Sequence, residues 1–263
     1  MGFFFKTKEE EFEILFSWAD AFDIPDHIFP RKMSTLNEIS KLNLSRLEIS
    51  DIPKEFKNLT KLIDLNVSGN LLEKLPSSFT ELTKLRRLNL SDNEFEIFPQ
   101  EVFELHSLET FYFDENYIQA IPKEIEKISN LHELYLHGNE ISELPIELFN
   151  LTLLEKLYLD DNEIKDLPTE IRQLKNLKKL NVSENQIRLI PTEIKELSKL
   201  EEFNISHNKL DTVPEEMGKL SNLQILDISH NDIIDLPMRI RELENLTELH
   251  IHKTLIKKID ISR

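Results

Sequence analysis

The histidines near the C-terminal end are the residues of this sequence best suited to metal or proton chemistry. His207 and His230 lie 23 residues apart, at equivalent positions of consecutive segments, and His250 and His252 follow in the next segment. Imidazoles held close together bind transition metals, and they change charge near neutral pH. One hypothesis is therefore a metal- or pH-responsive module at this end. Because only Asp227 offers a supporting carboxylate, we favour solvated surface histidines and expect no bound metal and no cofactor.

Three tyrosines with the same spacing form a second candidate site. They replace an asparagine that most other segments carry, and the residue two positions later changes with them from Ser to Asp or His. Tyrosine is enriched among the residues that dominate protein interfaces. Tyrosines surrounded by carboxylates favour Lys or Arg of a partner, through cation–π and charge contacts. The alternative is that the tyrosines do not bind a partner and only stabilise the sheet, by about 0.5–1.5 kcal/mol per stacked pair. The candidate partner-binding residues are Tyr112, Asp114, Glu115, Glu133, Tyr135, His137, Lys156 (the one cation), Tyr158, Asp160 and Asp161.

Enzymatic chemistry lacks its usual residues here. The chain has no cysteine and four glycines, so it has neither a thiol nucleophile nor a glycine-rich phosphate loop. Acidic pairs such as Asp160 and Asp161 are adjacent in sequence and lie in an open trough, which suits general acid–base catalysis poorly. We therefore expect a protein that is not an enzyme.

Charge and composition restrict the partners. The formal net charge is −17, so a phosphate backbone or an anionic membrane would be repelled, and we expect neither nucleic-acid nor membrane binding. The absence of cysteine favours a reducing compartment. The start, MGFFFKTKEEEFEILF, lacks a signal peptide's basic region, and no apolar run approaches the roughly 20 residues of a membrane helix. These features predict a cytoplasmic protein, while export without a recognisable signal peptide stays open.

A 23-residue period organises most of the chain and must position both candidate sites. Leucine recurs from Leu62 to Leu246, asparagine from Asn70 to Asn231, and proline from Pro53 to Pro237. The LxxLxL part predicts a short strand with its leucines on one side, and LPxxI predicts a helical return segment. One unit cannot bury its own leucines, so the units must stack into a solenoid with a parallel sheet.

The repeat unit, LxxLxLxxNxLxxLPxxIxxLxx, resembles the leucine-rich repeat family over residues 39–263. The 23-residue unit, with LPxxIxxL in its second half, resembles that of the intracellular class, which includes Ras-pathway scaffolds, Scribble-type proteins and many bacterial proteins. The resemblance implies an α/β solenoid, a horseshoe with a parallel concave β-sheet and short helical or 3-10 convex segments. It also implies a non-catalytic scaffold or interaction module that binds a partner protein on the concave face. The carboxylates around the tyrosines favour a partner with a basic or mixed-charge surface. A secreted bacterial effector that engages host proteins through the same face is an alternative.

The two ends of the solenoid need covering. Within residues 8–22, Phe12, Leu15, Phe16, Ala19 and Phe22 form one helical stripe. We therefore expect a helical cap at residues 1–38, then ten leucine-rich repeats at residues 39–263, the last one partial. The C-terminal edge carries Leu249, Ile251 and Ile259. We expect a monomer, with self-association through that edge as an alternative.

Overall fold

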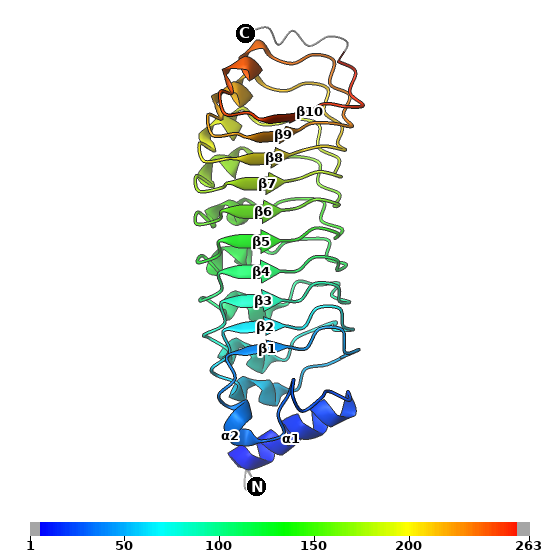
Figure 1. The fold of residues 1–263 in the computed structure, drawn as a ribbon, viewed down its shortest axis with the longest axis vertical. Coiled ribbons are helices and arrows are strands. Elements are labelled where there is room, and N and C mark those ends of the chain that lie inside the picture. The colour runs from blue at the N-terminus through cyan, green and yellow to red at the C-terminus, as the bar shows by residue number, and fades with distance from the viewer. Residues whose placement is uncertain (1–5, 257–263) are drawn as a thin grey trace.

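Residues 6–256 are described by the computed structural model, and they form an elongated stack of repeated turns (Figure 1). Within them, ten three-residue strands pair in chain order into one parallel, open and uncurled sheet. Each residue pairs with its equivalent 23 positions later, as Leu134 does with Leu157. The sequence period is therefore the register of the sheet. The strands are β1 (Lys41–Asn43), β2 (Asp64–Asn66), β3 (Arg87–Asn89), β4 (Thr110–Tyr112), β5 (Glu133–Tyr135), β6 (Lys156–Tyr158), β7 (Lys179–Asn181), β8 (Glu202–Asn204), β9 (Ile225–Asp227) and β10 (Glu248–His250).

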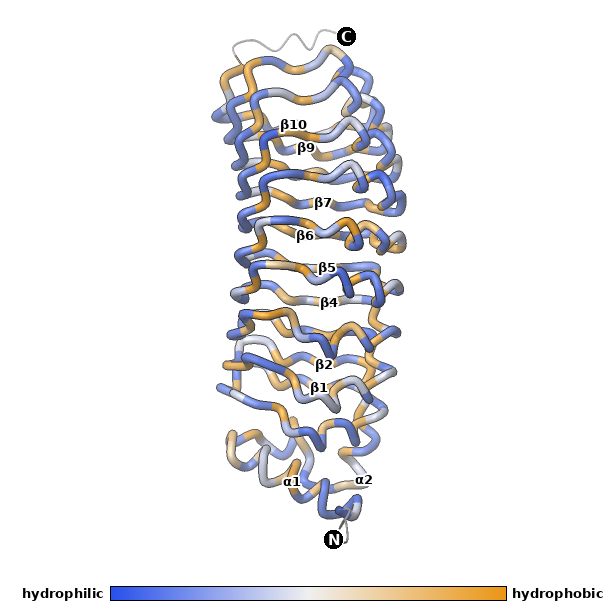
Figure 2. The backbone as a smooth tube through the Cα atoms, turned by 180° about the vertical axis from the view of Figure 1, so that it is seen from behind, coloured by the Kyte–Doolittle hydropathy of each residue, from blue (hydrophilic) through white to orange (hydrophobic). Residues whose placement is uncertain are grey.

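Short 3-10 helices return the chain on the side opposite the sheet. Each is five residues long and follows a proline, whose fixed φ near −70° prepares the first helical turn. Seen from behind, apolar and polar stretches alternate along every turn of the stack (Figure 2). The predicted solenoid is thus confirmed. The helices are η1 (Lys54–Asn58), η2 (Ser77–Glu81), η3 (Gln100–Glu104), η4 (Lys123–Lys127), η5 (Ile146–Asn150), η6 (Thr169–Gln173), η7 (Thr192–Glu196), η8 (Glu215–Lys219) and η9 (Met238–Glu242).

The leucines of the repeat fill one continuous core between the sheet and the 3-10 helices. Leu134 and Leu136 are fully buried, whereas Tyr135 between them lies on the opposite, solvent-exposed face of the sheet. This alternation follows from the two-residue period of a strand. We call the solvent-exposed side of the sheet the sheet face; it is the face predicted to be concave.

The recurring asparagines, from Asn70 to Asn231, hydrogen-bond the backbone after each strand ends. We call them the asparagine column. Asn139 is buried, and its Nδ2 donates hydrogen bonds to the carbonyl oxygens of Phe113, Leu136 and His137 at 3.0, 3.1 and 3.2 Å. Its Oδ1 accepts one from the backbone N–H of Ile118 at 3.3 Å. The side chain therefore joins consecutive repeats, and Asn139 is a structural residue.

Helix α1 (Lys8–Ala21) covers the first repeat, followed by α2 (Met33–Leu36). Thr7 and Glu10 form a capping box at the start of α1. Trp18 packs edge-on against Phe29 and Phe56, with ring centroids 5.6 and 5.5 Å apart. The predicted helical cap is confirmed, although Phe16 and Phe22 of the stripe are only partly buried. The boundary between residues 38 and 39 stays a prediction.

At the other end, Leu249 and Ile251 are partly buried against the core. Ile259, which we predicted to extend this apolar edge, lies outside the described residues. Within residues 6–256, no helix is long and apolar enough to cross a bilayer.

Candidate functional site

Three stacked tyrosines stand at the centre of the sheet face. Tyr112, Tyr135 and Tyr158 end β4, β5 and β6, and the strand register places each directly beside the next. Their ring centroids are 4.4 and 4.8 Å apart, with interplanar angles of 17° and 6°. We call these three residues the tyrosine ladder. The structure brings them together as the spacing predicted.

The stacking decides which parts of each ring a ligand can reach. Both faces of Tyr135 are covered by its neighbours, so it presents only its ring edge and its hydroxyl. The hydroxyl donates a hydrogen bond to Glu133 Oε2 at 3.0 Å. Burial, together with this carboxylate, raises the pKa of Tyr135, which therefore stays a neutral donor. Cation–π contacts, expected of the ladder as a whole, are open only on the outward faces of Tyr112 and Tyr158.

Each of these two outward faces borders a hollow of the sheet face. The hollow beside Tyr112 has a volume of about 460 Å³. The hollow beside Tyr158 has a volume of about 210 Å³. Both contain asparagine side chains and ionisable groups of both signs, so each could hold a polar or charged group of a partner. The first is lined by Lys41, Leu42, Asn43, Asp64, Asn66, Arg87 and Asn89, and the second by Lys179, Leu180, Asn181, Glu202, Phe203, Asn204, Ile225, Asp227 and His250.

On the side where the strands begin, charges of opposite sign neutralise one another. Lys156 Nζ lies 2.9 Å from Glu133 Oε1, and Lys179 Nζ lies 2.6 Å from Glu202 Oε1. Burial alone would raise the pKa of Glu133, but the hydrogen bonds from Lys156 and Tyr135 outweigh it and lower that pKa. The expectation that Lys156 is the one cation beside the ladder is therefore wrong. It is paired, and Lys179 occupies the equivalent position one strand further on.

On the side where the strands end, Asp114 supports its neighbours from a buried position. Its Oδ2 accepts a hydrogen bond from Ser91 Oγ at 3.0 Å, and its Oδ1 accepts one from the His137 backbone N–H at 3.2 Å. The same oxygen lies 2.7 Å from His137 Nδ1. Asp114 is only 5% exposed and supports His137 from below, and its contact with a partner stays a prediction. The hydrogen bond with Asp114 raises the pKa of His137 against the opposing effect of burial.

These contacts explain why two columns of the repeat change together. In the flanking repeats the Oδ1 of the asparagine, as in Asn89 and Asn181, accepts a hydrogen bond from the backbone N–H two residues later, at 2.9 and 3.1 Å. A tyrosine ring cannot accept that bond. In the middle repeat the carboxylate of Asp114 reaches across from the preceding repeat and accepts it from His137 instead. In the repeat of Tyr135, the aspartate that replaces serine in the second column thus takes over the hydrogen bond that asparagine makes in the flanking repeats.

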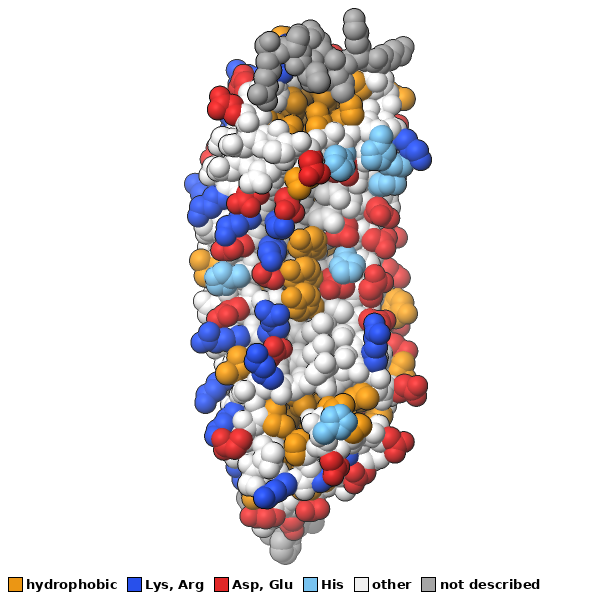
Figure 3. All heavy atoms as spheres, viewed as in Figure 1, with side chains coloured by type: hydrophobic (Ala, Val, Ile, Leu, Met, Phe, Trp, Pro, Cys, Tyr) orange, Lys and Arg blue, Asp and Glu red, His pale blue; other side chains and the backbone are white. Residues whose placement is uncertain are grey.

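Beyond this column, acidic side chains follow the ends of the strands. Glu115 and Asp161 are exposed at positions with φ of 50° and 52°. Gly138 occupies the equivalent position between them, and a Cβ there would lie 2.7 Å from the Glu115 carboxylate, so glycine leaves room for that side chain. Figure 3 shows acidic groups gathered on this side of the central apolar strip, giving way to histidine toward the C-terminal end. We call Asp92, Glu115, Asp161 and Glu184 the acidic edge.

Asp160 differs from the other carboxylates of the set. Its Oδ1 is buried and has no hydrogen-bond partner among the described residues. Burial accordingly raises the pKa of Asp160, with the nearby Asp114 adding to this effect. Asp160 is thus partly buried, whereas the following residue, Asp161, is exposed.

Sequence reasoning missed four residues near the ladder: Arg87 and Lys179 at the strand starts, and Asp92 and Glu184 on the acidic edge. They occupy the same repeat positions as Lys156 and Asp161, in the two repeats that flank the ladder, so extending those columns by one repeat on each side would have identified them.

The C-terminal histidines stack on one another. The rings of His207 and His230 are 3.7 Å apart at 15°, and His252 meets His230 edge-on at 5.0 Å. His250 lies apart from them, with its Nδ1 3.6 Å from Asp227 Oδ2. Partial burial lowers the pKa of His230, and the neighbouring His207 adds to this effect. Within residues 6–256, no three histidine or acidic side chains are grouped so that they could hold a metal ion.

Comparison with known proteins identifies the repeats. A model described as "Leucine-rich repeat region" matches residues 119–209, and one described as "Leucine rich repeat" matches residues 37–95 and 189–233. No curated protein matches the chain significantly.

Solved structures share the fold. A leucine-rich repeat protein of Leptospira interrogans is 33% identical with a TM-score of 0.71; the match covers 82% of this chain and 61% of that one. The ectodomain of the Arabidopsis thaliana receptor kinase GASSHO1/SCHENGEN3, in complex with CASPARIAN STRIP INTEGRITY FACTOR 2, is 27% identical with a TM-score of 0.75, covering 83% and 28%. A Listeria monocytogenes internalin, 24% identical with a TM-score of 0.66 and coverage of 81% and 67%, shares the fold. This chain thus spans under two thirds of the length of the first two proteins. With its repeat register, its buried asparagine column and these matches, the chain belongs to the leucine-rich repeat family.

Proposed function

We propose that this chain is a non-catalytic protein-binding module that takes a partner protein on its sheet face, around the tyrosine ladder. The leucine-rich repeat fold is typical of protein–protein interaction modules, and the Arabidopsis receptor ectodomain to which the chain is similar is in complex with CASPARIAN STRIP INTEGRITY FACTOR 2. The observation that carries the proposal is the ladder itself: three stacked rings at the centre of a largely polar face.

The geometry around the ladder fits a partner with basic or mixed charge. The stacked rings are a stiff platform that loses little conformational entropy on binding. Lysine or arginine of the partner can reach the outward face of Tyr112 or Tyr158 and the acidic edge, while the paired charges at the strand starts accept groups of either sign. Ten strands at ~4.8 Å spacing span about 43 Å, which accommodates a standard interface of about 800 Å² per partner.

The repeat supplies its own conservative test of the ladder. Asparagine fills the ladder column in the flanking repeats and accepts a backbone hydrogen bond there. A variant with Tyr112→Asn, Tyr135→Asn and Tyr158→Asn therefore removes the rings and leaves a side chain that this column already accommodates. Circular dichroism would first establish that the variant is folded.

The measurement is a cross-linked pull-down from native lysate with wild-type protein, the triple variant and Leu189→Asn. Leu189 is 60% exposed and belongs to the segment between β7 and η7, away from the ladder, so it controls for general loss of an apolar side chain. We expect a partner that wild type and Leu189→Asn retain and the triple variant loses. Equal capture by a folded triple variant would remove the ladder from the binding surface.

A further inference from the structure

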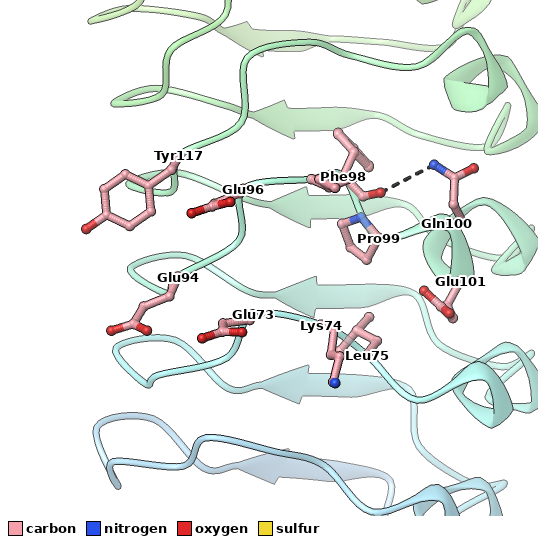
Figure 4. Close-up of a pocket in the computed structure, with 11 residues that line it drawn as sticks. Glu73, Lys74, Leu75, Glu94, Glu96, Phe98, Pro99, Gln100, Glu101 and Tyr117 are labelled. Atoms are coloured by element: carbon pink, nitrogen blue, oxygen red, sulfur yellow. Dashed lines mark hydrogen bonds between the residues drawn. The ribbon is translucent and has the colours of Figure 1, made fainter.

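A pocket of about 610 Å³ lies on the back of the solenoid, on the side away from the sheet face. It is formed by the segments that link β2 to η2, β3 to η3 and β4 to η4, together with the first residues of η3 (Figure 4). Its volume falls within the roughly 300–1,000 Å³ of pockets that hold compact ligands. We call it the back pocket; Glu73, Lys74, Leu75, Glu94, Glu96, Ile97, Phe98, Pro99, Gln100, Glu101 and Tyr117 line it.

The floor of the back pocket is apolar and firmly held. Phe98 is buried, and its ring packs against Phe103, Phe111 and Phe113 with centroids 5.1, 5.8 and 5.0 Å apart. Leu75 and Pro99 continue the same surface. A floor fixed by a cluster of aromatic rings is preorganised, so a ligand would not have to order it.

Two large apolar side chains are exposed at the pocket and do not belong to the hydrophobic core. Ile97 is 75% exposed and Tyr117 is 54% exposed. The position of Ile97 carries Lys, Ala, Glu, Asp or Thr in the other repeats except at Leu189, and that of Tyr117 carries a charged residue or glutamine except at Leu71 and Leu255. Grouped exposed apolar side chains are typical of interaction sites. Here they adjoin a preformed pocket.

The rim of the back pocket carries unpaired negative charge. Four glutamates, Glu73, Glu94, Glu96 and Glu101, face one lysine, Lys74, so the rim has a formal charge of 1 − 4 = −3. Within residues 6–256, none of these five side chains makes an ion pair or a side-chain hydrogen bond, unlike Glu133 and Glu202 on the sheet face. Figure 4 shows Glu73, Glu94 and Glu96 toward one end of the pocket and Glu101 toward the other. Leu75, Phe98 and Pro99 lie between these two ends, with Lys74 beside Leu75, and Tyr117 lies at the end that carries the three glutamates.

We propose that the back pocket binds an extended segment of a partner protein in which a bulky apolar side chain lies between Lys or Arg residues. The apolar side chain packs against the exposed Ile97 over the floor of the pocket, and the flanking cations pair with the glutamates at the two ends, one of them beside Tyr117. This site is separate from the tyrosine ladder, so it gives the module a second contact, which can engage another protein or a tail of the same one.

The probe is a phage-displayed library of random peptides about a dozen residues long, a length that lets an extended segment present alternate side chains to pockets. Wild-type protein is the target, and Ile97→Ser and a Glu94→Gln, Glu96→Gln double variant test the floor and the rim. Leu189→Ser is the matched control, because Leu189 occupies the position of Ile97 four repeats later and is also exposed. Selected peptides are then synthesised, and their affinities are measured in solution.

We expect selected peptides with an aromatic or aliphatic residue flanked by Lys or Arg. Ile97→Ser should weaken their binding about ten-fold or more, since a buried isoleucine side chain contributes that much. The Gln double variant should weaken it about two- to five-fold per carboxylate at low salt and less at high salt. Leu189→Ser and the Tyr→Asn ladder variant should bind as wild type does.

The proposal is overturned if the library yields no peptide that prefers wild type to Ile97→Ser, or if the selected peptides are acidic. It is also overturned if their binding is lost in the ladder variant, because they would then occupy the sheet face. Since the ladder variant and Ile97→Ser alter opposite sides of the sheet, failure of one proposal leaves the other standing.

Discussion

Replacing Asn139 by alanine measures what the asparagine column contributes to stability. The side chain accepts from the backbone N–H of Ile118 at 3.3 Å and donates to the carbonyl oxygens of Phe113, Leu136 and His137 at 3.0–3.2 Å. It is 8% exposed, so water cannot easily replace these bonds. Alanine removes all four at once.

The cost follows from which groups keep another partner. The carbonyl of Leu136 still accepts from Asn162 Nδ2 at 2.9 Å, and that of His137 from the backbone N–H of Glu115 at 2.9 Å. The N–H of Ile118 has no other partner among the described residues. One orphaned buried donor costs about 1–3 kcal/mol, and the weakened carbonyl of Phe113 adds about 1 kcal/mol. The free energy of unfolding should fall by about 2–4 kcal/mol and Tm by roughly 5–15 °C.

The aspartate variant sharpens this prediction. Asn139→Asp keeps the shape and the acceptor for Ile118, but it places a carboxylate oxygen against three carbonyl oxygens. At pH 7, Asn139→Asp should lower the free energy of unfolding at least as much as Asn139→Ala does. Because the folded state raises the pKa of the new carboxyl above its unfolded value, the folded state binds the proton more tightly. Stability should therefore recover as the pH falls and be lost as the pH rises through the folded pKa.

Urea and thermal unfolding followed by circular dichroism provide the measurement. Asn150→Ala is the matched control, since Asn150 is exposed and its side chain donates one hydrogen bond, to Glu126 Oε2 at 2.8 Å. We expect the control to change the free energy of unfolding by no more than about 0.5 kcal/mol. The reasoning would be refuted if Asn139→Ala behaved like the control, or if Asn139→Asp were the milder change at pH 7.

Two further predictions concern the sheet face. The hydrogen bond with Asp114 raises the pKa of His137 above 6.5, so His137 should contribute stability below pH 6.5 that is lost as the pH rises through the raised value. An NMR titration of the ring should show this, and Asp114→Asn should lower the pKa; an unchanged value would contradict the pairing. Tyr135→Phe keeps both stacking contacts and loses only the hydrogen bond to Glu133, which retains Lys156. Chemical denaturation should show a loss of about 0.5–1 kcal/mol; a loss as large as that of Tyr135→Asn would mean that the hydroxyl, not stacking, holds the ladder.

The repeat made the fold predictable to an unusual depth. A period of 23 residues kept without insertion fixes strand register, because each strand can only pair with its equivalent in the next turn, as Tyr112 does with Tyr135. The alternation of Leu134, Tyr135 and Leu136 likewise predicts which side chains are buried. The tyrosine ladder, the buried asparagines and the helical cap follow from these local rules.

Side-chain pairing was not predictable in the same way. The acidic residues around the ladder resemble one another in sequence, yet Asp114 is buried beneath His137, Asp160 has an unpartnered buried oxygen, and Glu115 and Asp161 are exposed. Lys156 is likewise bound to Glu133. These differences depend on distances of a few ångströms between side chains of neighbouring repeats. An alignment of the repeat sequences does not give those distances.

By itself, then, the sequence determined the solenoid, its register and the column that carries the tyrosines, because backbone pairing and leucine burial repeat with the same period. The tertiary structure alone decided which ring faces are free, which charges are already paired, and that the side chains around Phe98 leave a pocket on the back. Those properties arise where side chains of different repeats meet, and their sizes and charges, not the period, set the outcome.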